Sequence, residues 1–394
     1  MNEIKLQFGD VREKSISTKD DFVSHMVEHI AWRLGMKISL SWENEDWFSL
    51  GKSLGNEIKK FPSRENSGVA LGMIDDGGAE IKIELGKTGV QISTTKNINL
   101  DWFLSERCEQ LSSGKPLVTL LEGLSEGLEA RIEVMMCNFE DPHHTWEGIY
   151  RGVGIALSKI FTPINVNNEP KESSYYYALT SRGTAETGVS IGVDFSKNRP
   201  NTFSIKVNNS INVNGVEKLL KYFAEKCGFT MQVDFNSKML SSSHVVMEDI
   251  GLVLGKTLLE ILKVRMEQYG VNGAGSSLQT TRDFTEKNVR VGVSIEGRKF
   301  WRFVPFSTNY QELKEKFLIG QNVYTNLRSE DLDDFIDGLS GGLSGSIMIN
   351  LIDYKDVESA WVEIFGELGV ALKEVFEPNF YRKGVPPGVK ATLN

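Results

Sequence analysis

GLSEGLEARIEV occupies residues 123–134, and the closely similar GLSGGLSGSIMI occupies residues 338–349. The two stretches align without a gap at an offset of 215. At the same offset, GIALSKIF (154–161) falls on GVALKEVF (369–376). Similarity that recurs at one fixed offset is typical of a duplicated structural unit.

A second match extends the duplication toward the start of the chain. Residues 21–42 align without a gap with residues 214–235 at an offset of 193. Together the matches predict two similar modules, residues 1–172 and 173–394. The polar, turn-rich stretch 165–174 is the expected linker between them.

Each module also reads as two copies of a smaller unit. Apolar residues at helical spacing run into a short alternating strand, and a second helix follows, as in 120–128, 131–136 and 146–160. Alternating runs elsewhere predict antiparallel strands with one solvated face; they are 79–94, 188–196, 202–209 and 289–304. We therefore expect an α+β fold in which helices pack on one face of mostly antiparallel sheets.

Composition excludes several classes of protein. The 394 residues are 40% hydrophobic and 25% charged, which is typical of a soluble globular protein. A net charge of -9 argues against nucleic acid or an anionic membrane as partner. Three widely spaced cysteines form no disulfide framework, and no long apolar segment or signal peptide is found. The expected location is the cytoplasm.

Two of the five histidines are adjacent in EDPHHTWEGIY (140–150). If a helix begins near Pro142, His143 and Glu147 share a face and His144 lies about 100° around it. Imidazole and carboxylate at this spacing suit a divalent metal such as manganese, iron or zinc. The alternative is an ordinary helix start, capped by Asp141, with Glu147 solvated.

The other histidines occupy similar helical positions. In SHVVMEDI (243–250), His244 and Glu248 are four residues apart, as His143 and Glu147 are. His25 and His29 form another pair with this spacing. Scattered core or surface histidines rarely repeat in this way.

These stretches resemble the imidazoleglycerol-phosphate dehydratase family. FVSHMVEHIA (22–31) is similar to the family's FLDHMLEQIA, SHVVMEDIGLVLGKTL to its HHTVEDTGLALGEAL, and HHTWEGIYRGVGIAL to its second HHxxE helix. Shorter matches run through the second half, at RGTAET (182–187), EGRK (296–299) and PGVKATL (387–393). The matches are spread over nearly the whole chain.

The resemblance implies a fold of the ribosomal protein S5 domain 2-like type, with two repeats per module. It also implies a dimanganese site lined by HHxxE helices of neighbouring subunits, oligomers built from trimers, and dehydration of a phosphorylated imidazole. Members of the family carry one module per chain, whereas this chain carries two.

Each module has lost part of the family's motifs. The first module keeps His25, His143, His144 and Glu147, but has Leu40, Ser41 and Asn44 where the earlier HHxxE would stand. The second keeps His244 and Glu248, but has Lys218, Glu358, Ser359 and Val362 at other ligand positions. Since the family builds each site from several subunits, the resemblance implies one composite site per two modules.

The resemblance also implies which residues form the site. The metal ligands, for Mn2+ or another divalent ion, are His25, His143, His144, Glu147, His244 and Glu248. The catalytic carboxylates are Glu147, Glu248 and Glu186, and the substrate-binding cations are Arg182, Arg298 and Lys390.

Blander alternatives stay open. Arg298 and Lys390 can equally be solvated cations, and Glu186 an ordinary strand residue. The rival function is a catalytically inactive, self-associating homologue with a vestigial or structural metal site. In both cases we expect a homo-oligomer.

Overall fold

The computed structural model describes residues 2–161, 176–207, 214–237, 242–389 and 393. The predicted module boundary at residue 172, like the linker 165–174, lies outside the described residues.

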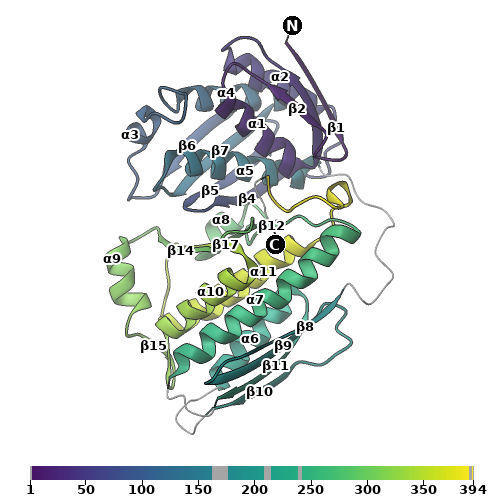
Figure 1. Cartoon of the computed structure of the whole chain (residues 1–394). Coiled ribbons are helices and arrows are strands. Elements are labelled where there is room, and N and C mark those ends of the chain that lie inside the picture. Colours follow the sequence, from purple (N-terminus) through teal and green to yellow (C-terminus); the bar gives the residue numbers. More distant parts are fainter. Residues whose placement is uncertain (1, 162–175, 208–213, 238–241, 390–392, 394) are drawn as a thin grey trace. The chain divides into compact units, whose positions relative to one another are not determined.

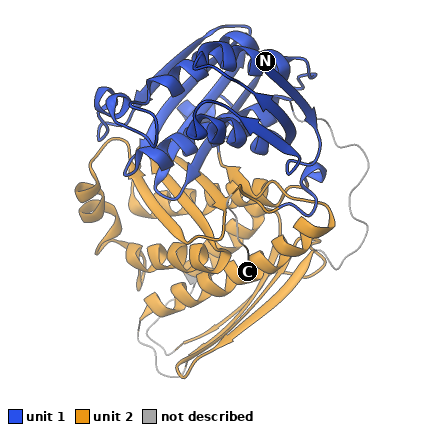
Figure 2. Ribbon diagram, turned by 45° about the horizontal axis from the view of Figure 1, so that its top comes forward, with its two compact units in different colours: residues 1–168, 278–286, 379–385 blue, residues 169–277, 287–378, 386–394 orange. Residues whose placement is uncertain are grey.

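The chain divides into two compact units, coloured separately in Figure 2. Unit 1 contains residues 1–168 with the later segments 278–286 and 379–385, and unit 2 contains the remainder.

Unit 1 carries four of the five histidines. In order, the elements of its main segment are β1 (Glu3–Phe8), β2 (Lys14–Ser17), α1 (Asp21–Leu34), β3 (Met36–Ser41), α2 (Trp47–Lys59), β4 (Ser67–Ile74), β5 (Gly77–Leu85), β6 (Gly89–Thr94), α3 (Leu100–Ser105), α4 (Lys115–Leu128), β7 (Ala130–Asn138) and α5 (Pro142–Phe161). Two short helices of the later segments complete it, α8 (Asp283–Glu286) and η3 (Phe380–Arg382). Two of the histidines lie on α1 and two on α5, the last helix of the main segment; Figure 1 labels both helices.

Unit 2 has a similar order of helices and strands. Its elements are β8 (Tyr177–Gly183), β9 (Thr187–Asp194), β10 (Thr202–Lys206), α6 (Asn214–Cys227), β11 (Thr230–Ser237), α7 (Ser243–Gln268), β12 (Ala274–Ser276), β13 (Val289–Ile295), β14 (Phe300–Pro305), α9 (Tyr310–Leu313), η2 (Lys314–Leu318), β15 (Asn322–Tyr324), β16 (Leu327–Arg328), α10 (Ser329–Leu343), β17 (Gly345–Leu351) and α11 (Val357–Phe376). It differs from unit 1 in one more strand before its first helix and a longer connection between β14 and α10.

Within each unit, the two larger sheets lie outside and four helices lie between them. In unit 2, α6 and α7 cover the sheet β10-β11-β9-β8, while α10 and α11 cover β12-β13-β17-β14. The two helix layers meet in the pairs α7–α10 and α6–α11, and unit 1 has the corresponding pairs α2–α4 and α1–α5. The predicted α+β class, with helices on one face of each sheet, is confirmed.

Strand direction differs from the prediction in one respect. In each of the four larger sheets, the strand that follows a helix has one antiparallel and one parallel neighbour. Thus β7 lies between β5 and β6, so these two strands do not pair with each other. The expectation of antiparallel pairing is wrong for β6, β10 and β14, because a strand distant in sequence occupies the intervening place.

The sequence predicts that each sheet has one solvated face, and the structure differs from this prediction in the stretch 289–304. Strands β1 and β11 alternate between more and less buried residues, as expected. All residues of β13 and β17 are buried, including Arg290 and Ser294. One solvated face is therefore wrong for the first part of the run 289–304.

Glycines allow the paired helices to touch backbone to backbone. On α4, a Cβ at Gly123 would lie 2.0 Å from the Phe48 carbonyl oxygen, and one at Gly127 would lie 2.1 Å from that of Lys52. On α10, a Cβ at Gly342 would lie 2.1 Å from the Leu252 oxygen. The repeated glycine spacing in GLSEGL and GLSGGL is therefore explained by close helix packing.

No described helix has the length and apolar character needed to cross a membrane. Cys108, Cys137 and Cys227 are all buried free thiols.

Gly342→Ala tests the close helix contact against a neighbouring control. We expect this variant to lose about 1–3 kcal/mol of unfolding free energy, because its methyl group overlaps the Leu252 backbone. At Gly341 the nearest atom to an added Cβ is the flexible Lys299 Cδ at 3.4 Å, so Gly341→Ala should gain up to about 1 kcal/mol from helix propensity. Urea unfolding measures both, and equal effects would contradict this account.

Candidate metal centre

Helices α1 and α5 carry the main cluster. The Asp20 side chain caps α1 by accepting from the Phe22 and Val23 amides at 2.9 and 3.0 Å. Asp141 accepts from the His143 amide at 2.8 Å, so α5 begins where the Asp-Pro pair predicted.

The two helices approach closely at a glycine. A Cβ at Gly154 of α5 would lie 3.1 Å from the carbonyl oxygen of His29 and 3.0 Å from that of Ile30. This close contact brings His25 and His29 of α1 beside His143 and Glu147 of α5.

The Glu147 carboxylate lies at the centre of this cluster and is 0% exposed. Its Oε1 lies 2.6 Å from His25 Nε2, 3.0 Å from His143 Nε2 and 3.5 Å from His29 Nε2. His143 and Glu147 therefore share a helix face, as predicted. The alternative of a solvated Glu147 is wrong, although Asp141 does cap the helix.

The outer nitrogens of two histidines face other carboxylates. His25 Nδ1 lies 2.9 Å from Glu28 Oε2, and His143 Nδ1 lies 2.7 Å from Glu109 Oε1. Because a carboxylate only accepts hydrogen bonds, each Nδ1 carries the proton. Each Nε2 then faces Glu147 either with a second proton or through a shared cation.

Burial and hydrogen bonding act in opposite directions on Glu147. Burial raises the pKa of its carboxyl, but hydrogen bonds from His143, His25 and His29 outweigh burial and hold that pKa far below its ordinary value. Burial, reinforced by the charge of Arg151, lowers the pKa of His29 to about 3. Glu147 is thus charged and His29 neutral at physiological pH.

His144 aims at a different point, as predicted. Its Nδ1 lies 2.5 Å from Asp76 Oδ1 and its Nε2 lies 3.7 Å from Asp75 Oδ2, both in the turn between β4 and β5. The hydrogen bond to Asp76 raises the pKa of His144. This partner fixes the orientation of the ring.

In unit 2, His244 and Glu248 share one face of α7, with His244 Nε2 3.7 Å from Glu248 Oε2. His244 Nδ1 is hydrogen-bonded to Asp334 of α10, which raises the pKa of His244. Both side chains are about half exposed, at 50% and 47%. The predicted spacing is confirmed, but this pair lies at the surface.

The remaining predicted residues have varied surroundings. Arg182 on β8 forms an ion pair with Asp249, which also accepts from Thr187 Oγ1 at 2.6 Å. Glu186 is exposed in the bend between β8 and β9, so its interpretation as a strand residue is wrong. Arg298 is exposed between β13 and β14, and Lys390 lies outside the described residues.

Sequence reasoning missed several members of the cluster. His29 could have been found, because its spacing from His25 matches that of a ligand pair. Glu28 lies three residues from His25 and gives a weaker signal of the same kind. Glu109 and Asp76 come from distant loops, and no local pattern indicates them.

The donor set fits a divalent ion. Ligands that bond one ion at about 2.1 Å lie roughly 3.0–3.4 Å from each other, and the Nε2 and Oε1 separations at Glu147 range from 2.6 to 3.5 Å. Ligand atoms of His25, His29 and Glu147 all lie within 4.8 Å of one another. Histidines held at Nδ1 by a carboxylate are typical of metal ligands.

The equivalent helix pair of unit 2 provides an internal comparison. At the offsets of 193 and 215, Lys218 and Tyr222 replace His25 and His29, while Glu358 and Val362 replace His143 and Glu147. The helix pair is conserved between the units, but the central carboxylate is not. The scaffold therefore does not require the cluster.

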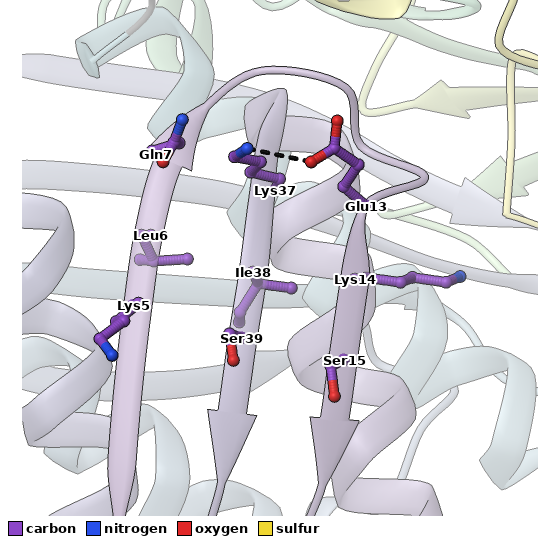
Figure 3. A pocket seen from close by; sticks show the side chains of 9 residues that line it. All are labelled: Lys5, Leu6, Gln7, Glu13, Lys14, Ser15, Lys37, Ile38 and Ser39. Carbon is purple, nitrogen blue, oxygen red and sulfur yellow. Dashed lines mark hydrogen bonds and ion pairs between the residues drawn. The ribbon is translucent and has the colours of Figure 1, made fainter.

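Two cavities lie on the N-terminal part of unit 1. One, of about 500 Å³, is lined by Lys14, Ser15, Ile16, Asp21, Ser24, His25 and Glu28. The other, of about 430 Å³, crosses the sheet β1-β3-β2, where Lys37 pairs with Glu13 at 3.0 Å (Figure 3). Lys14 and Ser15 line both cavities, but only the first reaches the histidine cluster.

Comparison with known proteins supports the motif-based resemblance. An imidazoleglycerol-phosphate dehydratase of Leuconostoc mesenteroides is 25% identical over 210 residues, which is 53% of this chain and 94% of that protein. The chain resembles imidazoleglycerol-phosphate dehydratase. The Pyrococcus furiosus enzyme of that name is 27% identical over 152 residues, which is 37% of this chain and 82% of that protein.

Two solved structures of similar proteins resemble the chain only weakly. A crystal structure of the Pyrococcus furiosus enzyme covers 51% of this chain and 94% of its own, at 20% identity and a TM-score of 0.38. That of the Staphylococcus aureus enzyme covers 51% of this chain and all of its own, at 18% identity and a TM-score of 0.37. No family model matches the chain. Relatives about half as long as this chain agree with a tandem duplication.

Glu147→Gln tests the buried carboxylate in chelator-treated protein. The variant has an amide in place of a buried charge that accepts hydrogen bonds from three imidazoles. We therefore expect urea unfolding to show a loss of about 3 kcal/mol or more of unfolding free energy at pH 7.5. Because folding lowers the pKa of Glu147, this difference is present above the unfolded carboxyl pKa of about 4.3 and shrinks at lower pH. Glu248→Gln, at a half-exposed position, should change stability by less than about 0.5 kcal/mol.

Asp333→Asn tests the acidic side of α10 near His244. Asp333 accepts from Trp301 Nε1 at 2.9 Å, and burial raises its pKa to about 6. A raised carboxyl pKa favours folding below the unfolded pKa and penalises it above the folded pKa. The variant should therefore gain about 1–3 kcal/mol at pH 8 and less than about 1 kcal/mol at pH 4. Chemical unfolding at both values measures this, and a pH-independent difference would contradict it.

Proposed function

We propose that the chain is a metal-dependent hydro-lyase of the imidazoleglycerol-phosphate dehydratase type. The observation that carries the proposal is the buried Glu147 carboxylate with imidazole nitrogens of His25 and His143 at 2.6 and 3.0 Å. These are donors that hold manganese and similar divalent ions. The relatives named above supply the reaction class.

In this proposal, unit 1 holds the ion through His25 and Glu147. His143 and His144 stay predicted ligands by resemblance, and Asp76 orients the His144 ring. Glu28 and Glu109 accept hydrogen bonds from the protonated Nδ1 atoms of His25 and His143, so both Nε2 atoms are available to bind a metal. When bound, the ion supplies Lewis-acid stabilisation of negative charge on the substrate. That His244 and Glu248 join the same composite site stays a prediction.

The substrate proposed is a phosphorylated imidazole. The cavity of about 500 Å³ beside His25 is in the size range of small-molecule sites. Lys14 lines it and can meet a phosphate through a charge-assisted hydrogen bond. Arg182, Arg298 and Lys390 stay proposed substrate contacts by resemblance.

Dehydration requires one group to remove a proton from carbon and another to protonate the departing hydroxyl. Glu186 and Glu248 are the proposed carboxylates for these transfers, and both are accessible to solvent. Glu147, being buried among imidazoles, serves as ligand in this scheme. The cytoplasmic location and the homo-oligomer are further parts of the proposal.

The second candidate is an inactive, self-associating homologue in which the cluster is structural or vestigial. It is favoured by the loss of every equivalent ligand on α6 and α11 of unit 2. The charge of Arg151, which acts on His29, also opposes a cation. The two candidates differ in turnover, not in fold.

Metal content and turnover distinguish the candidates. For protein purified without chelator, we expect near-stoichiometric divalent metal and manganese-dependent dehydration of imidazoleglycerol phosphate. His144→Ala should lower turnover at least about tenfold, because it removes an imidazole of the proposed site. Chelator should abolish turnover and manganese should restore it.

The opposite results are equally clear. Absence of turnover in metal-loaded protein, with the oligomer intact by light scattering, would support the inactive homologue. Absence of any bound metal would exclude the catalytic proposal and the structural metal site together.

A further inference from the structure

His29 belongs to the cluster but not to the motif that led to it. In the resembling stretch FLDHMLEQIA, glutamine stands at the position of His29. Here the side chain is an imidazole, 0% exposed, one helical turn beyond His25. Its Nε2 lies 3.1 Å from His25 Nε2 and 3.5 Å from Glu147 Oε1.

Protons alone satisfy this arrangement poorly. His25 Nδ1 is engaged with Glu28, so His25 Nε2 offers at most one further proton. If His25 and His29 each direct an Nε2 proton at Glu147 Oε1, no proton lies between their two Nε2 atoms, which are 3.1 Å apart. A cation between the three atoms interacts with all of them at once.

The spacing supports the same interpretation. Three ligand atoms around one ion, each bonded at about 2.1 Å, lie roughly 3.0–3.4 Å apart. Of the separations among His25 Nε2, His29 Nε2 and Glu147 Oε1, the 3.1 Å between the two imidazoles lies in this range, and the 2.6 and 3.5 Å to the carboxylate lie just below and just above it. Side-chain shifts of a few tenths of an ångström would place all three atoms around one ion. This set comes from two adjacent helices of unit 1 and needs no other part of the chain.

We propose that His29 is a metal ligand, and that His25, His29 and Glu147 form a three-ligand divalent-metal site complete within unit 1. The inference rests on the metal binding in the proposed function and adds a ligand to it. His29 then compensates for imidazoles that the first module lacks at Leu40 and Ser41. Two imidazoles and one carboxylate also leave coordination positions open for substrate or water.

Unit 2 agrees with a shared role for the three residues. Where Val362 replaces Glu147, Tyr222 replaces His29 and Lys218 replaces His25. A Cβ at the neighbouring Gly366 would lie 2.6 Å from the Tyr222 ring, so aromatic packing fills that space instead. All three ligand positions differ together between the units.

The test compares the full chain with His29→Gln, which restores the residue of the resembling motif. Both proteins are stripped with chelator and titrated with Mn2+ and with Zn2+ against a fluorescent competitor. X-ray absorption of the zinc-loaded forms counts the imidazole ligands. Circular dichroism of the metal-free proteins checks that the variant is folded.

We expect wild-type protein to bind one ion, and His29→Gln to bind it at least tenfold more weakly with one imidazole fewer. Unchanged affinity and an unchanged imidazole count would overturn the assignment of His29 and leave the proposed function standing. Wild-type protein that binds neither metal would overturn both.

A measurement on wild-type protein avoids any dependence on the variant's folding. In histidine-labelled protein, the five imidazoles give few nitrogen resonances. Zinc should shift the His29 Nε2 resonance to a metal-bound position and remove its exchange with solvent protons. A His29 resonance that zinc does not move would overturn the assignment.

Discussion

Backbone contact between helices at glycine is the constraint on which the architecture depends. At Gly154 the missing side chain lets α5 approach the α1 backbone beside His29 and Ile30. Gly369 does the same for α11 and α6, where a Cβ would lie 2.7 Å from the Phe223 oxygen. Dispersion and burial stabilise such close packing only while glycine occupies these positions, because a side chain would push the helices apart. The duplicated glycines therefore preserve two copies of one helix arrangement.

The chemistry depends on one buried charge placed in that arrangement. An isolated carboxylate in the interior costs several kcal/mol, so Glu147 requires positive partners. His25 and His143, each backed by a second carboxylate, supply them as imidazolium protons or through a common ion. Replacement of Glu147 by valine at the equivalent position of unit 2 removes this requirement, and the histidines are absent there too.

The two units thus share one helix arrangement, but within the described residues only unit 1 carries the buried histidine cluster. Unit 1 retains a buried cluster suited to a metal, beside a cavity that contains Lys14. Unit 2 retains the helix pairs and the half-exposed His244 and Glu248, but its equivalent positions are Lys218, Tyr222, Glu358 and Val362, none of which is buried. One copy can lose its ligands without loss of fold, because glycine contacts and apolar burial, rather than the histidines, stabilise the helix layers.

The repeats and helical spacings alone predicted the doubled α+β architecture, the helix start at Pro142 and the shared face of His143 and Glu147. These follow from short-range rules, since residues four apart on a helix are neighbours wherever the helix lies. Only the tertiary structure decided that β7 separates β5 from β6, that Glu147 is fully buried, and that Glu109 and Asp76 orient His143 and His144. Such contacts join residues tens of positions apart, and they depend on how whole helices and strands pack rather than on any local pattern.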